Sequence, residues 1–244
     1  MKIVQLNIWG GKLGQQIIDF LNEEKPDFVC MQEVNDLKGR AGYKFFATLD
    51  EIKEGAGFDE AFMSANYSSG YMERKLEYGN AILSKLPFKS TKTVFTRGEY
   101  KQNFDIVNDD GNIRSLQVAQ IQVNGTTLNI LNHHGYHLGI NKSGDDETMR
   151  QMGLIADVID KLQGPIIFCA DLNLNPSSES VKIIDKKLTN LSAANNLKRT
   201  YNQFSAVNEV CDYIFINELV KVINFKMSDE LLSDHKALIL EFEL

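Results

Sequence analysis

The chain of 244 residues contains few cysteines, tryptophans and histidines: three, one and four, respectively. Cys30, Cys169 and Cys211 all stand inside apolar runs, and none belongs to a CxxC pair. This arrangement argues against zinc fingers and against a disulfide framework. We expect the three thiols to be small, buried hydrophobic groups.

Long apolar runs and a leader sequence are also missing. No apolar run approaches the length of a membrane span. The N-terminus predicts a strand from its third residue and lacks the small-residue cleavage site of a signal peptide. These absences predict a cytoplasmic protein without a transmembrane segment.

An excess of positive charge is missing: acidic residues outnumber basic ones by 33 to 26, which gives a formal net charge of −7. Such a surface gives no general attraction for duplex nucleic acid, whose binding depends on phosphate neutralisation. It still permits a local cleft or a bound divalent cation that meets a phosphate. Hydrophobic residues at 43% and charged residues at 24% are typical of a globular protein. No repeat or Pro/Ser linker interrupts the chain, so a single domain over residues 1–244 is predicted.

Hydrophobic periodicity predicts many strands and few helices. Apolar residues at helical spacing predict helices over 15–22, 148–162 and 178–188. Apolar or alternating runs predict strands over 2–8, 28–31, 78–84, 94–95, 115–123, 127–131, 166–170, 212–216 and 237–242. We therefore predict two packed mixed sheets flanked by helices. Residues 36–75 and 97–112 give no clear pattern and are expected to shape a substrate cleft.

Four apolar runs end abruptly in polar groups that bind metals or hold water. Their endings are Asn7, Gln32-Glu33, Asp171-Leu172-Asn173 and Ser233-Asp234-His235. Such groups are costly to bury unpaired, so their repetition at strand ends predicts one shared polar site. Glu33 is a candidate ligand for a hard cation such as Mg²⁺, with Asn7 beside it. Asp171 could orient a water, and the amide of Asn173 could donate to a developing oxyanion.

The four histidines lie in two places, with His133, His134 and His137 in one segment and His235 in the other. An imidazole paired with a carboxylate becomes a general acid or a positively charged clamp, and Asp212 is the candidate partner. A zinc site built from the three clustered histidines is an alternative. It would need a helix, which Gly135 disfavours. Arg114, at the start of a strand, would stabilise transferred charge if it lay near a phosphate.

The order of these motifs along the chain resembles the endonuclease/exonuclease/phosphatase superfamily. The segments are Leu-Asn-Ile-Trp, Gln-Glu-Val, Tyr-Gly-Asn-Ala-Ile-Leu-Ser, Arg114, Asn-His-His, Ala-Asp-Leu-Asn, Asp-Tyr-Ile-Phe and Ser-Asp-His, spanning Asn7 to His235. The resemblance implies a four-layer αββα sandwich with the active site at one end of two central sheets. Departures are Ala170 in place of the usual glycine and His133 in place of the common threonine.

By this resemblance, each site residue acquires an expected role. Glu33 looks like the principal Mg²⁺ ligand, with Asn7 and Asp234 assisting and Mn²⁺ as an alternative ion. His134, Asp171, Asn173, Asp212 and His235 are the expected catalytic residues. Arg114 and Asn80 are the expected substrate-binding residues.

The expected activity is metal-assisted, in-line attack of water on phosphorus in a phosphoester. The acting enzyme would be a nuclease or phosphodiesterase, and its partner a nucleic acid or nucleotide. The absence of a Trp-rich segment disfavours the abasic-site branch, and the segment before Asp212 lacks the inositol-phosphatase pattern. The alternatives are a lipid phosphodiesterase of sphingomyelinase type and a catalytically silent binding module of the same fold.

Overall fold

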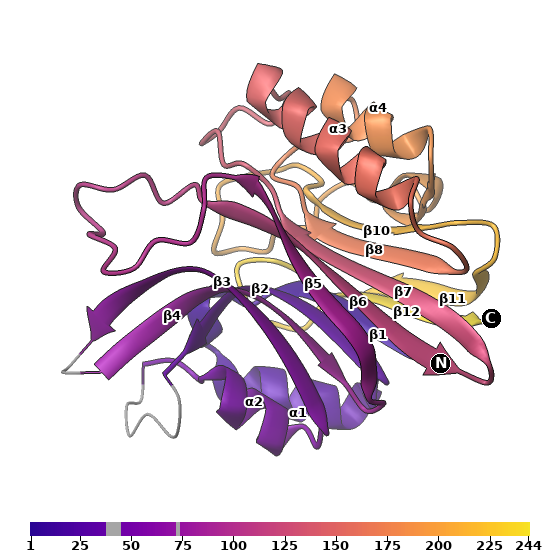
Figure 1. The fold of residues 1–244 in the computed structure, drawn as a ribbon, viewed down its shortest axis with the longest axis horizontal. Coiled ribbons are helices and arrows are strands. Elements are labelled where there is room, and N and C mark those ends of the chain that lie inside the picture. Colours follow the sequence, from indigo (N-terminus) through magenta and orange to yellow (C-terminus); the bar gives the residue numbers. More distant parts are fainter. Residues whose placement is uncertain (38–44, 72–73) are drawn as a thin grey trace.

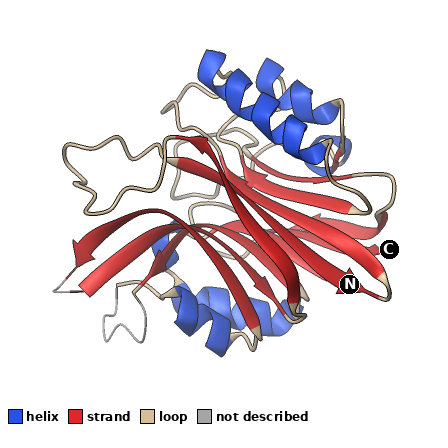
Figure 2. Ribbon diagram, in the orientation of Figure 1, coloured by secondary structure: helices blue, strands red, loops and turns tan. Residues whose placement is uncertain are grey.

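Two six-stranded sheets pack face to face, and helices cover the outer face of each (Figures 1 and 2). This computed structural model describes residues 1–37, 45–71 and 74–244. The predicted fold class, an αββα sandwich with two mixed sheets, is confirmed. Within the described residues, no helix is long and apolar enough to cross a membrane.

The strands and helices have the following bounds. The first sheet has the order β11 (Lys221–Met227), β12 (Leu238–Glu243), β1 (Lys2–Asn7), β2 (Phe28–Asp36), β4 (Arg74–Ser84) and β3 (Glu60–Tyr71). The second has the order β5 (Phe88–Arg97), β6 (Arg114–Val123), β7 (Thr126–His134), β8 (Ile166–Asp171), β10 (Asp212–Ile216) and β9 (Thr189–Asn190). The helices are α1 (Gly14–Glu24), α2 (Leu49–Gly55), α3 (Asp146–Ile159), α4 (Glu179–Asp185), α5 (Leu191–Ala194) and the 3₁₀ turn η1 (Trp9–Gly11).

Each predicted strand and helix is present, with shifted ends. The structure adds β3, β9, β11, α2, α5 and the turn η1, and it extends β5 over ten residues. β5 and β11 are largely exposed edge strands, and such strands lack the apolar runs that mark buried ones. The short helix α2 forms around a capping box, in which Thr48 and Glu51 satisfy each other's backbone N–H groups.

Three apolar clusters hold the layers together. One lies between α1, α2 and the first sheet, another between α3, α4 and the second sheet, and the third between the two sheets. Side chains alternate between the two faces of a strand. In β1, Ile3 therefore enters the inter-sheet cluster, whereas Val4 and Leu6 face the helices.

The inter-sheet layer changes character along the strands. It is apolar where Ile3, Cys30 and Ile130 meet. Farther along β1, Gln5 and Asn7 keep the same parity as Ile3, so they also point between the sheets. Their amides accordingly bond to Asp212 and Asp171 of the second sheet. Both termini lie at the opposite end of the sheets, and the long β5–β6 loop projects on the polar side (Figure 1).

Candidate active site

A polar cavity of about 340 Å³ opens at this polar end of the inter-sheet layer. The strand ends of both sheets and the loops that follow them supply its walls. Its lining residues are Glu33, Tyr67, Tyr78, Gly111, Arg114, His134, His137, Asp171, Asn173, Tyr201, Ser205, Val207, Asp234 and His235. The segments 36–75 and 97–112, which were expected to shape a cleft, each contribute one lining residue, Tyr67 in β3 and Gly111 in the β5–β6 loop.

Asp171, the last residue of β8, is the centre of the cavity's hydrogen-bonding groups. Its Oδ2 accepts a hydrogen bond from Asn7 Nδ2 at 3.0 Å and lies 3.6 Å from His134 Nε2 and 3.7 Å from His235 Nε2. The two imidazole distances exceed hydrogen-bonding range, and such a gap suits a bridging water or substrate oxygen. Burial opposes ionisation of this carboxyl, but the neighbouring imidazoles, His235 first, and the hydrogen bonds from Asn7 and the Asn173 backbone together outweigh it and hold the pKa of Asp171 at about 2.

His235 is held by a second carboxylate behind it. Its Nδ1 lies 2.9 Å from Asp212 Oδ2, and the other oxygen of Asp212 accepts a hydrogen bond from Gln5 at 3.1 Å. The Tyr201 ring packs against the imidazole with a centroid separation of 4.2 Å. Burial alone would lower the pKa of His235, but the carboxylates of Asp212 and Asp171 raise it to about 10. The imidazole is therefore a cation near neutral pH, with Nε2–H available to the cavity.

A bulge in β2 delivers Glu33 to the cavity. Pairing with β4 shifts register between Met31 and Val34, and Glu33 adopts a left-handed φ of 58°. Met31 and Val34 both face the helices, so the extra residue lets Gln32 and Glu33 both face inward. Asn7 Nδ2 donates to Glu33 Oε1 at 3.1 Å and thereby bridges Glu33 and Asp171.

The negative charge around Glu33 fits a divalent cation. Burial raises the pKa of Glu33, and the neighbouring carboxylates of Asp234 and Asp171 raise it further. Asp234 lines the same cavity, and its Oδ1 accepts a hydrogen bond from Ser233 at 3.1 Å. Hard cations take oxygen ligands of this kind and would relieve the repulsion between the carboxylates. Glu33 and Asp234 could therefore hold Mg²⁺ or Mn²⁺, with Asn7 fixing the Glu33 carboxylate.

A second group of potential metal ligands lies deeper in the site. Asp171, Asp212 and His235 each place one ligand atom within 4.8 Å of the others. Asp212 and His235 already satisfy each other, because the imidazole Nδ1 bonds to the carboxylate. The oxygen-rich edge at Glu33 and Asp234 is therefore the better place for a hard cation.

Asn173 follows Asp171 in a tight turn. Its backbone N–H donates to Asp171 Oδ1 at 2.9 Å, and its φ of 56° lies in the left-handed region that asparagine tolerates. The side-chain oxygen accepts hydrogen bonds from Lys142 Nζ at 2.9 Å and from His137 Nδ1 at 3.0 Å. The turn therefore brings both Asp171 and Asn173 to the cavity.

The two predicted substrate-binding residues differ in position. Arg114 lines the cavity, but its guanidinium donates to the carbonyls of Gly111, Ile113 and Gly135 and to Asn112 Oδ1. It contributes positive charge to the cavity, and its hydrogen bonds join residues 111–113 to Gly135 on the other side. Asn80 is fully buried, lies outside the cavity lining and donates to the Ser115 carbonyl between the sheets, so its role in substrate binding stays a prediction.

Aromatic residues to which the sequence analysis assigned no role also line or border the cavity. Tyr67 and Tyr78 stack with a centroid separation of 5.0 Å on one side. Trp9 and Phe204 stand 5.7 Å apart near the Ser205 wall, and Lys12 Nζ lies 3.5 Å above the Trp9 ring. We call Trp9, Phe204 and Lys12 the aromatic ledge. Trp9 is partly buried and Phe204 is 49% exposed, so both rings remain accessible in part.

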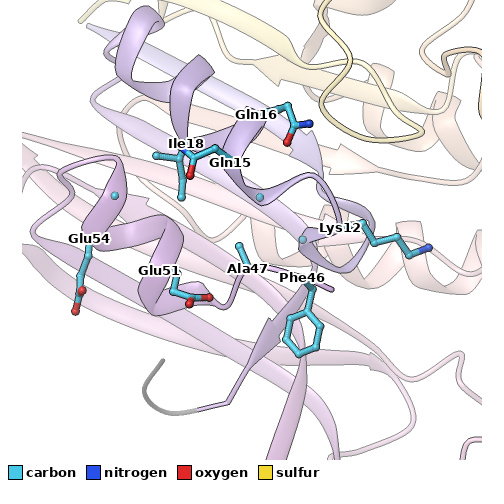
Figure 3. Close-up of a pocket in the computed structure, with 11 residues that line it drawn as sticks. Lys12, Gln15, Gln16, Ile18, Phe46, Ala47, Glu51 and Glu54 are labelled. Atoms are coloured by element: carbon cyan, nitrogen blue, oxygen red, sulfur yellow. The ribbon is translucent and has the colours of Figure 1, made fainter. Parts of the chain in front are cut away.

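A larger cavity of about 680 Å³ lies on the first sheet's helical side, between α1, α2 and residues 46–47. Its charged residues do not converge, since Lys12 and Glu54 lie at opposite ends and point apart (Figure 3). The smaller cavity brings carboxylates, imidazoles and an arginine together, so it is the candidate active site.

Comparison with known proteins agrees with this architecture. A sequence profile described as the Endonuclease/Exonuclease/phosphatase family matches residues 4–235, nearly the whole chain. A search of the curated proteins finds no match.

Solved structures of low sequence identity share the fold. An endonuclease/exonuclease/phosphatase from Beutenbergia cavernae superposes with a TM-score of 0.73 at 16% identity, over 100% of this chain and 71% of that one. The mannosyl-6-phosphatase Bt3783 from Bacteroides thetaiotaomicron gives 0.70 at 14%, over 100% of both chains. The human Nocturnin catalytic domain with bound sulfate gives 0.72 at 15%, over 100% and 94%.

Proposed function

The chain belongs to the Endonuclease/Exonuclease/phosphatase family, and from this premise we propose that it is a divalent-metal-dependent phosphoester hydrolase. Members of this family are generally hydrolases of phosphoester bonds that need a divalent metal. The observation that carries the proposal is the approach of two imidazole nitrogens to one carboxylate oxygen, Asp171 Oδ2, in a cavity that Glu33 and Asp234 also line.

The reaction we propose is the displacement of an alcohol from phosphorus by water. Asp171 Oδ2 orients the attacking water. Because a carboxylate with a pKa of about 2 is a weak base, it accepts the water's proton only as the new P–O bond forms and makes that water more acidic. The P–O bond to the leaving group breaks, and the departing oxygen takes up a proton from solvent. His235, charged by its pairing with Asp212, donates from Nε2 to a phosphoryl oxygen. His134 and the Asn173 amide add neutral donors at the same place.

A cation held by Glu33 and Asp234, when bound, would neutralise charge on the phosphoryl oxygens and the leaving group. Burial lowers the pKa of His134 well below its usual value, so this imidazole is uncharged at neutral pH. The site thus combines one charged and one neutral imidazole around a dianionic or monoanionic phosphate, which limits repulsion with any bound cation.

The substrate we propose is a nucleotide or a single-stranded nucleic acid. The aromatic ledge supports this choice, because stacked rings with a nearby ammonium group suit a base and its phosphate. The net charge of −7 disfavours an extended duplex, because duplex binding depends on neutralising many phosphates. It favours a substrate that is bound by contacts near the cavity alone. A sphingomyelinase-type lipid phosphodiesterase and a silent binding module remain the alternatives.

The test is hydrolysis of a small panel with added Mg²⁺ or Mn²⁺: plasmid DNA, single-stranded RNA, bis-p-nitrophenyl phosphate, sphingomyelin and a phosphoinositide. The wild-type protein is compared with Glu33→Ala and His235→Ala. We expect metal-dependent turnover on the nucleic acids that both substitutions reduce by about 10³-fold or more. Turnover of sphingomyelin alone would favour the lipid enzyme, and silence on every substrate by folded, metal-bound protein would favour the binding module.

A further inference from the structure

A buried lysine stands behind the candidate active site. Lys142 lies in the segment between β7 and α3, is 3% exposed and places Nζ 2.9 Å from Asn173 Oδ1. His137 Nδ1 lies 3.0 Å from the same oxygen. An ammonium group is rarely buried without a hydrogen-bonding partner, because burial removes its hydration. The amide oxygen that accepts its hydrogen bond belongs to Asn173, one of the candidate catalytic residues.

The lysine fixes which way this amide points. The oxygen and nitrogen of an asparagine side chain are interchangeable by a 180° rotation, and surrounding hydrogen bonds must decide between the two orientations. A lysine ammonium has three donors and no acceptor. The atom that faces Lys142 Nζ must therefore be the Asn173 oxygen, and the NH₂ group must point the other way.

The NH₂ group is consequently available to the cavity. Its neighbouring acceptor within the described chain is the Gly135 carbonyl at 3.5 Å, a long and weak contact. Asn173 itself lines the cavity. Because the backbone is already fixed by the turn onto Asp171 Oδ1, rotation of the carboxamide is the main freedom left at this residue.

We propose that Lys142, assisted by His137, is a positioning residue that holds the Asn173 carboxamide with its NH₂ group toward the phosphoryl oxygens. This inference rests on the proposed phosphoester hydrolysis. A rotated amide would present its oxygen to the phosphate, so it would repel the anion instead of donating to it. The lysine thus acts through Asn173 and does not contact the substrate.

A kinetic double-mutant cycle separates this role from a purely structural one. We expect Lys142→Met, which keeps most of the aliphatic stem, to lower kcat about 10-fold or more while KM stays within about 2-fold. In an Asn173→Ala background the same substitution should have no further effect, since no amide remains to be oriented. Lys142→Arg, which retains donors, should recover part of the loss. Additive effects of Lys142→Met and Asn173→Ala would overturn the proposal.

Asn173→Asp is the matched control for folding. A carboxylate at this position keeps both acceptors for Lys142 and His137 but has no donor to offer. We expect the thermal midpoint of this variant to stay at or above that of the wild type while turnover falls by about 100-fold or more. Retained turnover in Asn173→Asp would overturn the donor role of the amide.

A second readout needs no turnover. Because His137 Nδ1 shares the oxygen with Lys142, it must carry a hydrogen and donate. Long-range ¹H–¹⁵N NMR of the wild-type protein, recorded at a pH at which the spectrum itself shows a single hydrogen on the His137 ring, should therefore find the Nδ1–H tautomer. Lys142→Met should shift the population toward Nε2–H. A bare Nδ1 in the wild type would overturn the proposal, whereas Nδ1–H with no turnover on any substrate would refute the proposed function alone.

Discussion

At the scale of single residues, strand parity decides which polar side chains reach the site. In β7, Ile130 and Asn132 face the inter-sheet layer, so His134 faces it too, whereas His133 turns away and its Nδ1 lies 3.1 Å from the Ser115 carbonyl. The family resemblance assigned the catalytic role to His134 and not to His133. Counting in twos from the apolar residues of the same strand would have chosen His134.

A pair of matched substitutions tests this assignment. His134→Gln should lower turnover by about 100-fold or more, because it removes an imidazole from the cavity. His133→Gln should keep turnover within about 3-fold, because this side chain is buried behind the strand and burial keeps its pKa at about 4. Initial rates on one phosphodiester measure both variants. A larger loss in His133→Gln than in His134→Gln, with both proteins folded, would contradict the assignment.

The Asp212–His235 pair predicts a pH dependence. The pKa of His235 is raised to about 10, above the usual value of about 6.5. The pairing therefore stabilises the folded state fully below about pH 6.5, and this stabilisation is lost as pH rises through about 10. Asp212→Asn removes the facing charge, so the pKa of His235 should fall and turnover should decline at a lower pH than in the wild type.

The measurement is an NMR titration of the His235 imidazole alongside a pH–rate profile. Turnover of Asp212→Asn near neutral pH should fall by about 10²- to 10⁴-fold, as expected when a histidine loses its orienting carboxylate. A variant whose His235 titrates as in the wild type would show that Asp212 does not set the charge of the imidazole.

At the scale of elements, the bulge in β2 and a row of buried amides shape the site. Gln32 Nε2 donates to Asn132 Oδ1 at 2.6 Å, and Asn132 Nδ2 donates to Gln117 Oε1 at 2.8 Å, which links the two sheets. Gln5 joins this row through Gln32 at 3.0 Å. The row separates the apolar layer from the charged cavity and fixes the strand ends that carry Glu33 and His134.

The amide row should matter for stability. Gln32→Met keeps the side-chain volume but leaves Asn132 and Gln5 with unpaired polar atoms, at a cost of about 2 to 4 kcal/mol of unfolding free energy. Gln122→Met is the matched control, since Gln122 is an exposed glutamine whose loss should cost less than about 0.5 kcal/mol. Urea unfolding at a fixed temperature measures both. Equal midpoints for the two variants would contradict a structural role for the row.

The strands also show how far the site can be predicted from the sequence. Apolar runs located the strands that form the site, except β3, because burial on both faces leaves a strong pattern. They could not place Glu33, since regular alternation after Met31 would turn this carboxylate toward the helices; only the bulge turns it inward. Tyr67 and Lys142 were missed for a different reason. They come from segments without periodicity, and long-range packing alone brings them to the site.

At the scale of the whole molecule, the protein carries a net negative charge, and its candidate active site is a small cavity. Overall charge does not attract a polyanion, so the aromatic ledge would carry much of the contact with a nucleotide substrate. The ledge joins segments far apart in the sequence, because Trp9 follows β1 and Phe204 belongs to the loop before β10. Its proximity to the cavity could not be inferred from either segment alone.

Removal of the ledge should affect binding more than chemistry. We expect Trp9→Ala to raise KM for a short oligonucleotide about 10-fold, as for the loss of one stacked base, with kcat changed less than about 3-fold. Phe45→Ala is the control, because Phe45 is an exposed aromatic residue (73%) outside the cavity lining. Steady-state kinetics on the oligonucleotide give both parameters. An unchanged KM in Trp9→Ala would remove the ledge from the substrate path.

The central claim is that one oxygen-rich edge binds a divalent cation needed for phosphoester hydrolysis. The most direct measurement is the rate of bis-p-nitrophenyl phosphate hydrolysis as a function of Mn²⁺ concentration in the wild type and in Glu33→Gln, which keeps the side-chain size and an acceptor for Asn7. The account predicts saturable, metal-dependent turnover in the wild type and a loss of about 10³-fold in the variant, with an unchanged or higher thermal midpoint. Equal rates and equal metal dependence in the two proteins would contradict it.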